Sequence, residues 1–234
     1  MNIAIIPARG GSKRIPRKNA LSFCGEPIIS YSIKAALETD VIEKVIVSTD
    51  DFEIAEIATE LGAEVPFIRN KALADDMTGT TEVIRDAITK YIALGNEVEN
   101  CLCLYATAPF VTRDIIEKAF ALFQQGKPDY LFTANQFSFP IQRALLENED
   151  GKIRVFDPEN IDKRSQDLPH TFHDAGQLYI AHTSTWLDSS KEIFSENSQM
   201  FKLPSYIVQD IDTPEDWKRA EVMYKVLKEM SHFK

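Results

Sequence analysis

Apolar and polar positions follow two different periods along the first part of the chain. Short apolar runs predict buried strands, at residues 2–7, 44–49, 101–109 and 129–134. Between them, apolar residues recur three or four positions apart and predict helices, at residues 27–38, 51–62, 79–95 and 112–126. Strands that alternate with helices indicate an α/β fold with a Rossmann-like, mostly parallel sheet and helices on both faces.

The alternation stops between Asn135 and His173. Three prolines, the turn sequence NEDG and scattered charges predict a loop-rich insertion there, with a hairpin near residues 144–156. Beyond the insertion, the pattern predicts two further strands and a last helix, at residues 176–181, 206–212 and 213–230. We therefore expect one domain over residues 1–234, in which residues 135–173 are an insertion.

The insertion is rich in apolar residues although little regular structure is predicted to cover them. These residues are Phe137, Phe139, Ile141, Leu145, Leu146, Ile153, Val155 and Phe156. Apolar surface of this kind usually meets a partner. The pattern therefore predicts a homodimer built partly through the insertion.

Charge and composition exclude several classes of protein. The chain has 26 Lys and Arg against 36 Asp and Glu, a net charge of −10, which argues against general nucleic-acid binding. Its three cysteines are too few for a disulfide framework and suit a reducing cytoplasm. Arg9 interrupts the first apolar run too early for a signal peptide, and no run is long enough to predict a membrane span.

The loop after the first predicted strand is basic although the chain is acidic. It holds two glycines and five cations, namely Arg9, Lys13, Arg14, Arg17 and Lys18. The loop has neither the G-x-G-x-x-G spacing nor the G-x-x-x-x-G-K-[ST] pattern. Backbone N–H groups at Gly10 and Gly11, with cations just beyond, favour a polyphosphate ligand; the alternative is a solvated basic turn.

Other candidate residues lie at the same predicted edge of the sheet. The stretches STDD and YATAP follow or end strands, so we expect them beside the basic loop. Asp210 and Asp212 lie two apart on a predicted strand and would share one face, which favours Mg²⁺ binding. The alternative is that Asp212 caps the last helix, although Thr213 could do so. Cys101 and Cys103 have no zinc-ligand partners at suitable spacing and are expected in the core.

The stretch IIPARGGSKRIPRKN resembles the signature loop of the CMP-sialic acid synthetase family, the cytidylyltransferases that activate nine-carbon acidic sugars. VSTDD, IRNKALADDMTGT, YATAPF and QDIDTPEDW fall in that family's order and spacing, so the resemblance covers nearly the whole chain. FPIQRAL, RSQDL and FHDAGQLY are similar to the subgroup that acts on pseudaminic acid. Sialic acid enzymes usually have Gln-Pro-Thr-Ser-Pro where this chain has YATAP.

The resemblance implies a nucleotide-diphospho-sugar transferase-like fold, a homodimer, Mg²⁺ as cofactor and CTP as co-substrate. The implied CTP-binding residues are Arg9, Lys13 and Lys18 for the triphosphate, with Ala8, Gly10, Gly11, Ser12 and Asn19 in the same loop, and Arg69, Asp76 and Thr80 near cytosine and ribose. Asp210 and Asp212 would hold Mg²⁺. The candidates for contacting the sugar are Gln142, Arg143, Arg164, Gln166, His173 and Gln177.

The implied reaction is transfer of a cytidylyl group from CTP to the acidic nine-carbon sugar, with release of pyrophosphate. Two alternatives remain open from the sequence. One is the same reaction on N-acetylneuraminic, legionaminic or 3-deoxy-octulosonic acid. The other is a regulatory module that binds CTP without catalysis.

Overall fold

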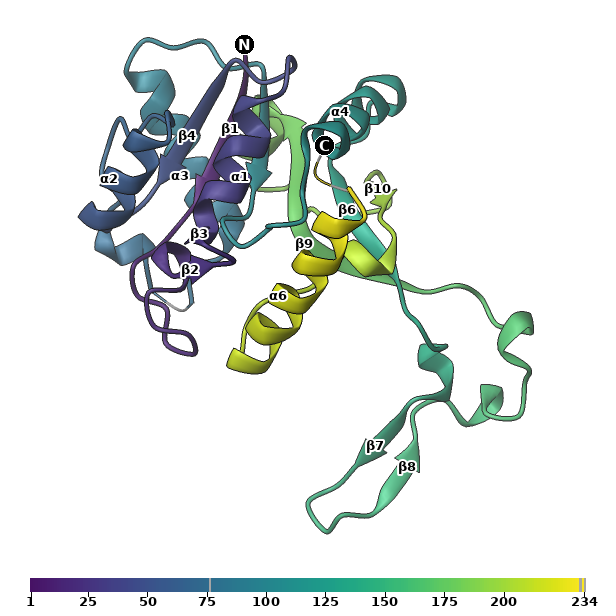
Figure 1. The fold of residues 1–234 in the computed structure, drawn as a ribbon. Coiled ribbons are helices and arrows are strands. Elements are labelled where there is room, and N and C mark those ends of the chain that lie inside the picture. Colours follow the sequence, from purple (N-terminus) through teal and green to yellow (C-terminus); the bar gives the residue numbers. More distant parts are fainter. Residues whose placement is uncertain (76, 232, 234) are drawn as a thin grey trace.

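Six strands form the central sheet of the computed structural model, which describes residues 1–75, 77–231 and 233 (Figure 1). The strands are β1 (Asn2–Pro7), β4 (Lys44–Ser48), β5 (Asn100–Leu104), β6 (Leu131–Gln136), β9 (Phe172–His182) and β10 (Gln199–Lys202). Their order across the sheet is β10-β6-β9-β5-β1-β4. Strand β9 is antiparallel to β5 and β6, and the other neighbouring pairs are parallel, so the predicted mostly parallel sheet is confirmed.

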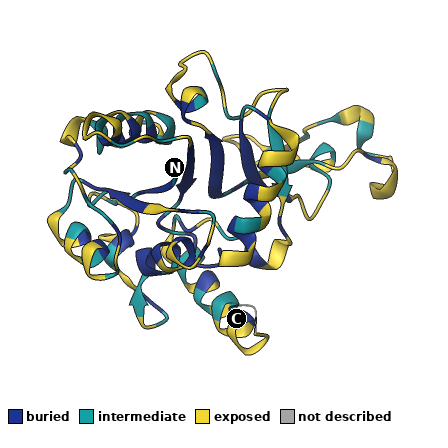
Figure 2. Cartoon of the chain, turned by 90° about the horizontal axis from the view of Figure 1, so that it is seen from above, coloured by how far each residue is buried: buried dark blue, intermediate teal, exposed yellow. Residues whose placement is uncertain are grey.

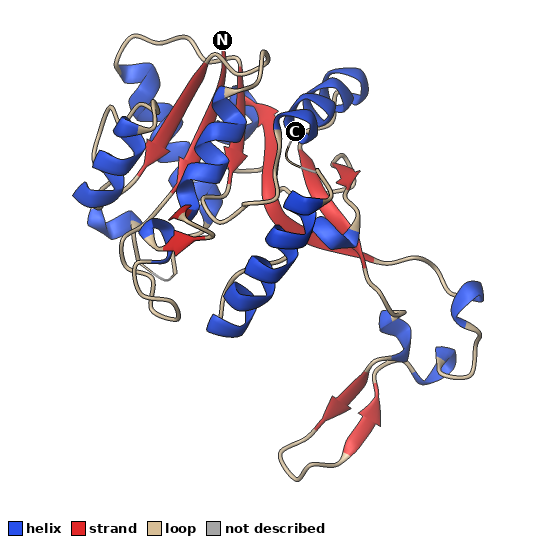
Figure 3. Ribbon diagram, viewed as in Figure 1, coloured by secondary structure: helices blue, strands red, loops and turns tan. Residues whose placement is uncertain are grey.

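Helices cover both faces of this sheet (Figure 3). They are α1 (Ile28–Leu37), α2 (Phe52–Glu60), α3 (Thr80–Ala93), α4 (Arg113–Gly126), α5 (Thr183–Leu187) and α6 (Pro214–Glu229). Apolar residues of α1, α2, α4 and α6 pack on one face, and those of α3 and α5 on the other. Within the described part of the chain, none of these helices has the length and apolar character to cross a membrane.

Burial on both faces explains why positions 3–6 of β1 are all apolar. In β1, Ala4 and Ile6 contact one helical layer, whereas Ile3 and Ile5 contact the other, and all four are buried. Figure 2 shows the strands of the central sheet mostly in the colour of buried residues. The two cysteines of β5 are buried and reduced, so the prediction that they are core residues is confirmed.

The remaining elements are short. Two pairs of antiparallel strands lie outside the central sheet, β2 (Ser22–Phe23) with β3 (Glu26–Pro27) and β7 (Leu145–Glu147) with β8 (Ile153–Val155). The 3₁₀ turns are η1 (Lys18–Ala20), η2 (Lys71–Leu73), η3 (Ile141–Arg143), η4 (Pro158–Asn160), η5 (Ser165–Asp167) and η6 (Ser205–Ile207).

Two predicted strands differ from the structure. Strand β5 ends at Leu104, and residues 105–109 turn away toward Pro109. The predicted strand at 206–212 is wrong, because its start belongs to η6 and residues 208–213 form an irregular loop. Residues 206–212 do not pair with β6 because β10, a strand that the sequence pattern missed, already occupies that edge of the sheet. Pro204 then leads the chain into η6.

The insertion projects away from the sheet as an extended arm (Figure 1). The arm, residues 137–171, leaves from the end of β6 and returns at the start of β9, which meet at one edge because these strands are antiparallel. The hairpin of β7 and β8 confirms the hairpin predicted near 144–156. Several large apolar side chains of the arm are exposed, namely Phe137, Phe139, Leu145, Ile153 and Phe156.

The two glycines of the basic loop have different steric surroundings, and this difference can be tested. An added Cβ at Gly10 would lie 2.6 Å from Oδ2 of Asp51, the residue that caps α2 through the N–H of Ile54. An added Cβ at Gly11 meets no atom within 4 Å. We expect Gly10→Ala to lower the free energy of unfolding by about 1–3 kcal/mol, and Gly11→Ala to change it by less than about 0.5 kcal/mol. Urea denaturation measures both, and equal stability of the two variants would contradict this explanation.

Candidate functional site

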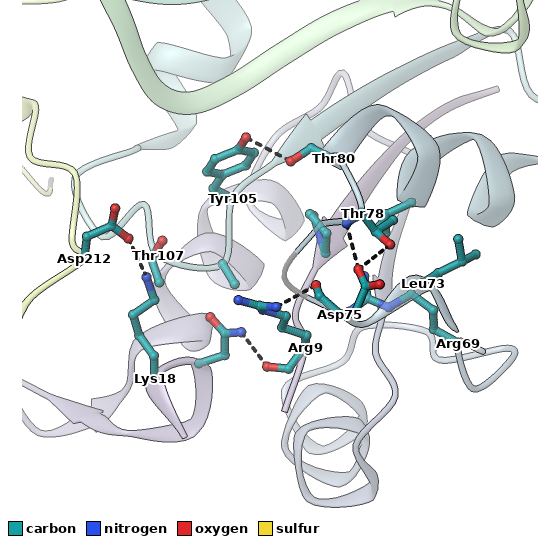
Figure 4. Close-up of a pocket in the computed structure, with 14 residues that line it drawn as sticks. Arg9, Lys18, Arg69, Leu73, Asp75, Thr78, Thr80, Tyr105, Thr107 and Asp212 are labelled. Carbon is teal, nitrogen blue, oxygen red and sulfur yellow. Dashed lines mark hydrogen bonds and ion pairs between the residues drawn. The ribbon is translucent and has the colours of Figure 1, made fainter. Parts of the chain in front are cut away.

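A pocket of about 340 Å³ opens at the carboxyl edge of the sheet (Figure 4). Loops that follow β1 and β5, the segment before α3 and the loop before α6 all contribute to its wall. Six residues proposed from the sequence line it, namely Arg9, Lys18, Asn19, Arg69, Thr80 and Asp212. The expectation that the basic loop and YATAP meet at one edge is therefore confirmed.

Backbone oxygen atoms hold two basic side chains of the first loop in the pocket. Arg9 Nη1 donates to the carbonyl oxygen of Asp75 at 2.6 Å. Lys18 Nζ donates to the carbonyl oxygen of Ile211 at 2.5 Å and lies 3.4 Å from Asp212 Oδ1. Asn19, buried beside them, donates to the carbonyl oxygen of Arg9 at 2.9 Å. The loop, the segment before α3 and the segment before α6 are thus tied together around one positively charged pocket.

The other cations of the loop do not line the pocket. Arg17 donates to both carboxylate oxygens of Asp51, at 2.5 and 3.0 Å, and to Glu53. The hydrogen bond and the charge of Arg17 lower the pKa of Asp51. Arg14 pairs with Asp212 at 2.9 Å, and Lys13 is exposed and does not belong to the pocket lining.

Arg69 is the most buried cation of the pocket, with only 4% of its surface exposed. Its guanidinium lies 3.8 Å from Asp50 Oδ1, an atom that also accepts the N–H of Gly10 at 3.0 Å. Burial lowers the pKa of Arg69, although the charge of Asp50 opposes this effect. Its Nε–H group finds no hydrogen-bond partner among the described residues. A buried donor without a protein partner is costly, so an oxygen atom of a ligand or of a water molecule at this place would stabilise it.

Asp210 and Asp212 lie in the irregular loop before α6, so the reason for placing them on one strand face is wrong. They remain electrostatically coupled, because the pKa of Asp210 is raised, first by partial desolvation of its carboxyl group and then by the charge of Asp212. Asp212 lines the pocket, whereas Asp210 is exposed beside it. Two electrostatically coupled carboxylates beside a basic pocket are a suitable donor set for Mg²⁺, which binds through one or two carboxylates plus phosphate oxygens. The described residues contain no cluster of three or more potential metal-ligating side chains.

The residues proposed to contact the sugar do not line this pocket. Four of them lie on the arm and make local contacts. Gln142 donates to the carbonyl oxygen of Pro169, and Arg143 donates to Oγ of Ser165. Arg164 donates to Asp167, and Gln166 lies in the turn of η5. His173 lies at the start of β9, and its Nδ1 atom is 2.8 Å from the carbonyl oxygen of Asp174. Gln177 is buried and donates to the carbonyl oxygen of Ile207 at 2.7 Å, so it holds η6 against β9.

The remaining proposed residues belong to the backbone of the first loop. Ala8 is buried and donates its N–H to the carbonyl oxygen of Ser48, which fixes the start of the loop. Gly10, Gly11 and Ser12 continue the loop outside the pocket lining. Asp76 lies outside the described residues.

The pocket wall also includes residues that the sequence pattern did not indicate, among them Leu73, Asp75, Thr78, Tyr105 and Thr107. Asp75 orders its own turn, because Oδ1 accepts the N–H of Met77 and the N–H and hydroxyl groups of Thr78. All five belong to IRNKALADDMTGT and YATAPF, so the signal that could have found them was the family resemblance that these two stretches carry.

Comparison with known proteins finds similarity to cytidylyltransferases over nearly the whole chain. The sequence model of the family described as "Cytidylyltransferase" matches residues 3–230. A pseudaminic acid cytidylyltransferase of Campylobacter jejuni is 44% identical over 96% of this chain and 97% of its own length. A CMP-N,N'-diacetyllegionaminic acid synthase of Legionella pneumophila is 28% identical over 97% of both chains. The structure of CMP:2-keto-3-deoxy-manno-octonic acid synthetase complexed with CTP has a similar fold, with a TM-score of 0.72 and 16% identity over 96% of this chain and 98% of its own.

Lys18 lines the pocket and Arg17 does not, so we predict different effects when each of these cations is removed. Lys18→Ala removes a cation of the pocket, and we expect it to weaken binding of inorganic triphosphate more than about tenfold, the scale of one charge-assisted hydrogen bond. Arg17→Ala removes a cation that pairs with acidic residues outside the pocket, and we expect a change of less than about threefold. Calorimetric titration compares the variants, and equal losses would mean that the loop acts only through its total charge.

Proposed function

The chain belongs to the cytidylyltransferase family, and we propose that it transfers a cytidylyl group from CTP to pseudaminic acid, with release of pyrophosphate. The observation that carries the choice of sugar is the 44% identity with the Campylobacter jejuni enzyme over nearly the full length of both chains. The pocket supports the nucleotide half of the reaction, because its cations face the space at the carboxyl edge where α/β sheets bind ligands.

The chemistry of this transfer matches the charges of the pocket. The anomeric hydroxyl group of the sugar attacks the α-phosphorus of CTP, and the bond to the pyrophosphate oxygen breaks. Negative charge grows on the phosphoryl oxygens and on the leaving group. Arg9 and Lys18 are held in place by backbone oxygens before the reaction, so they stabilise this charge without reorganising. Arg69 offers a buried N–H donor to the nucleotide.

Asp210 and Asp212 are the residues that would hold Mg²⁺. When bound, the ion neutralises and orients the phosphate oxygens. The ion pairs of Asp212 with Arg14 and Lys18 keep the carboxylate at the pocket wall. The pKa of Asp210 is raised first by partial desolvation and then by the charge of Asp212, and a cation between the two carboxylates would relieve their repulsion.

The arm supplies the second part of the proposal, which is that the enzyme works as a homodimer. The proposed sugar-binding residues of the arm lie away from their own pocket, and the apolar side chains of the arm are exposed. Both facts are explained if the arm packs against a second copy of the chain.

The three free cysteines are compatible with the reducing cytoplasm as the place of the reaction.

Pyrophosphate release with CTP and a panel of acidic sugars tests the proposed reaction. We expect kcat/KM for pseudaminic acid to exceed that for N-acetylneuraminic acid by about a hundredfold or more, because a site built to hydrogen-bond a substrate group rejects an analogue that lacks it. Legionaminic acid and 3-deoxy-octulosonic acid complete the panel. A preference for any of these three sugars would overturn the choice of pseudaminic acid, and CTP binding without turnover on any sugar would indicate a regulatory module.

Substitution of the aspartates tests the metal. We expect Asp210→Asn to lower turnover in Mg²⁺ by about a hundredfold, because it removes one anionic ligand and metal charge stabilisation is worth several kcal/mol. Glu215→Gln is the matched control, since this exposed carboxylate pairs only with Arg219 within the described structure, and its turnover should stay near the native value. Full activity in EDTA would mean that the aspartates are structural.

Sedimentation velocity tests the dimer. We expect the native chain to be dimeric at micromolar concentration and the double substitution Phe139→Asp and Ile153→Asp to make it monomeric, because both exposed side chains lie on the arm. Phe52→Asp, at an equally exposed phenylalanine on α2, is the control and should stay dimeric. A native chain that sediments only as a monomer would exclude this assembly.

A further inference from the structure

The loop before α6 presents two oxygen atoms to Lys18 although it has no regular structure. Nζ of Lys18 donates to the carbonyl oxygen of Ile211 at 2.5 Å. The same atom lies 3.4 Å from Oδ1 of Asp212 (Figure 4). Residues 208–213 lie in neither a helix nor a strand, so no regular hydrogen-bond ladder sets the direction of this carbonyl group. Other contacts therefore hold the loop.

Asp216, in the first turn of α6, supplies these contacts. Its Oδ2 atom accepts the N–H of Thr213 at 2.9 Å and the N–H of Asp212 at 3.3 Å. Its Oδ1 atom accepts the side-chain amide of Gln209 at 3.4 Å, and the same amide donates to the carbonyl oxygen of Asp210 at 2.7 Å. The backbone before and after the carbonyl group that holds the lysine is thus fixed, directly or through one amide, to a single carboxylate.

Helix capping explains only part of this arrangement. In the capping box, the hydroxyl group of Thr213 accepts the N–H of Asp216, and the carboxylate of Asp216 accepts the N–H of Thr213. The box requires neither the bond from the N–H of Asp212 nor the bond from Gln209. These two additional bonds extend from the helix cap to the part of the loop that contacts Lys18.

We propose that Asp216 is a positioning residue for the pocket, because it fixes the backbone around Ile211 and so aims the carbonyl oxygen that holds the ammonium group of Lys18. An ammonium group has three N–H donors. One donates to Ile211 and one to Asp212, and the third serves an oxygen atom of a polyphosphate. A cation held in this way needs no ordering when the ligand binds. The inference rests on the proposed function only for the class of this ligand.

Asp216→Ala tests the inference, with the affinity for inorganic triphosphate as the readout. Removal of a negative charge near a polyanion site would by itself strengthen binding, so a weaker affinity indicates lost geometry. We expect Kd to rise about fivefold, which is within the scale of one hydrogen bond. Calorimetric titration without added Mg²⁺ measures this affinity independently of the metal.

Thr213→Ala is the matched control, because it also removes one half of the capping box. It keeps the carboxylate of Asp216 and the backbone N–H groups that donate to it. We expect both variants to melt at a similarly lowered temperature, but Thr213→Ala to change Kd by less than about twofold. An equal loss of triphosphate affinity in both variants would mean that Asp216 acts only as a helix cap, and would overturn the inference.

A double-mutant cycle tests whether Asp216 acts through Lys18. In the Lys18→Ala background, Asp216→Ala should change Kd by less than about twofold, because the cation that it positions is gone. A further loss as large as in the native background would overturn the inference, since the effect would then not pass through Lys18.

Gln209→Ala provides a second variant if Asp216→Ala does not fold. It removes the amide that joins Asp216 to the carbonyl oxygen of Asp210, and we expect it to raise Kd about threefold. An unchanged Kd in this variant would then overturn the inference, as would a native protein that binds no triphosphate. The proposed function fails separately, when the native enzyme releases no pyrophosphate with any sugar, because triphosphate binding requires neither a sugar nor turnover.

Discussion

Burial of the central sheet on both faces is the constraint on which the rest of the molecule depends. Parallel strands need crossover connections that return the chain to the same end of the sheet, and here helices provide them. The carboxyl ends of β1, β4 and β5 therefore lie at one edge, where the loops that follow them meet. Lys18 and Asp212 become neighbours at this edge although 194 positions separate them in the sequence.

The pocket has the opposite sign to the chain as a whole. The net charge is −10, yet Arg9, Lys18 and Arg69 line one pocket. Each of these cations contacts an oxygen atom of the protein, so its position is set before a ligand arrives. Charges held in this way stabilise the negative charge of a transferred phosphoryl group more effectively than mobile surface cations. The acidic remainder of the chain surrounds a basic site for a polyanionic substrate.

The irregular parts of the sheet contribute as much to the site as its regular parts. Strand β9 runs antiparallel to its neighbours, which places both ends of the arm at the carboxyl edge of the sheet. A bulge around Gly176 turns Asp174 toward Tyr179, whose ring packs against the ring of Tyr105 in the pocket wall. A regular parallel strand at this position would neither bring both ends of the arm to this edge nor place Asp174 against Tyr179.

The sequence alone determined the helices, most strands, the mostly parallel sheet and the basic loop, because these depend on local periodicity and composition. It grouped Arg17 with Lys18, and only the folded chain separates them, since Arg17 meets Asp51 and Glu53 of the second helical segment. Strand β10 and the loop at 208–213 also required the tertiary structure, because pairing depends on which sheet edge is free. A local pattern encodes which residues are buried, whereas distances between remote side chains are decided by packing.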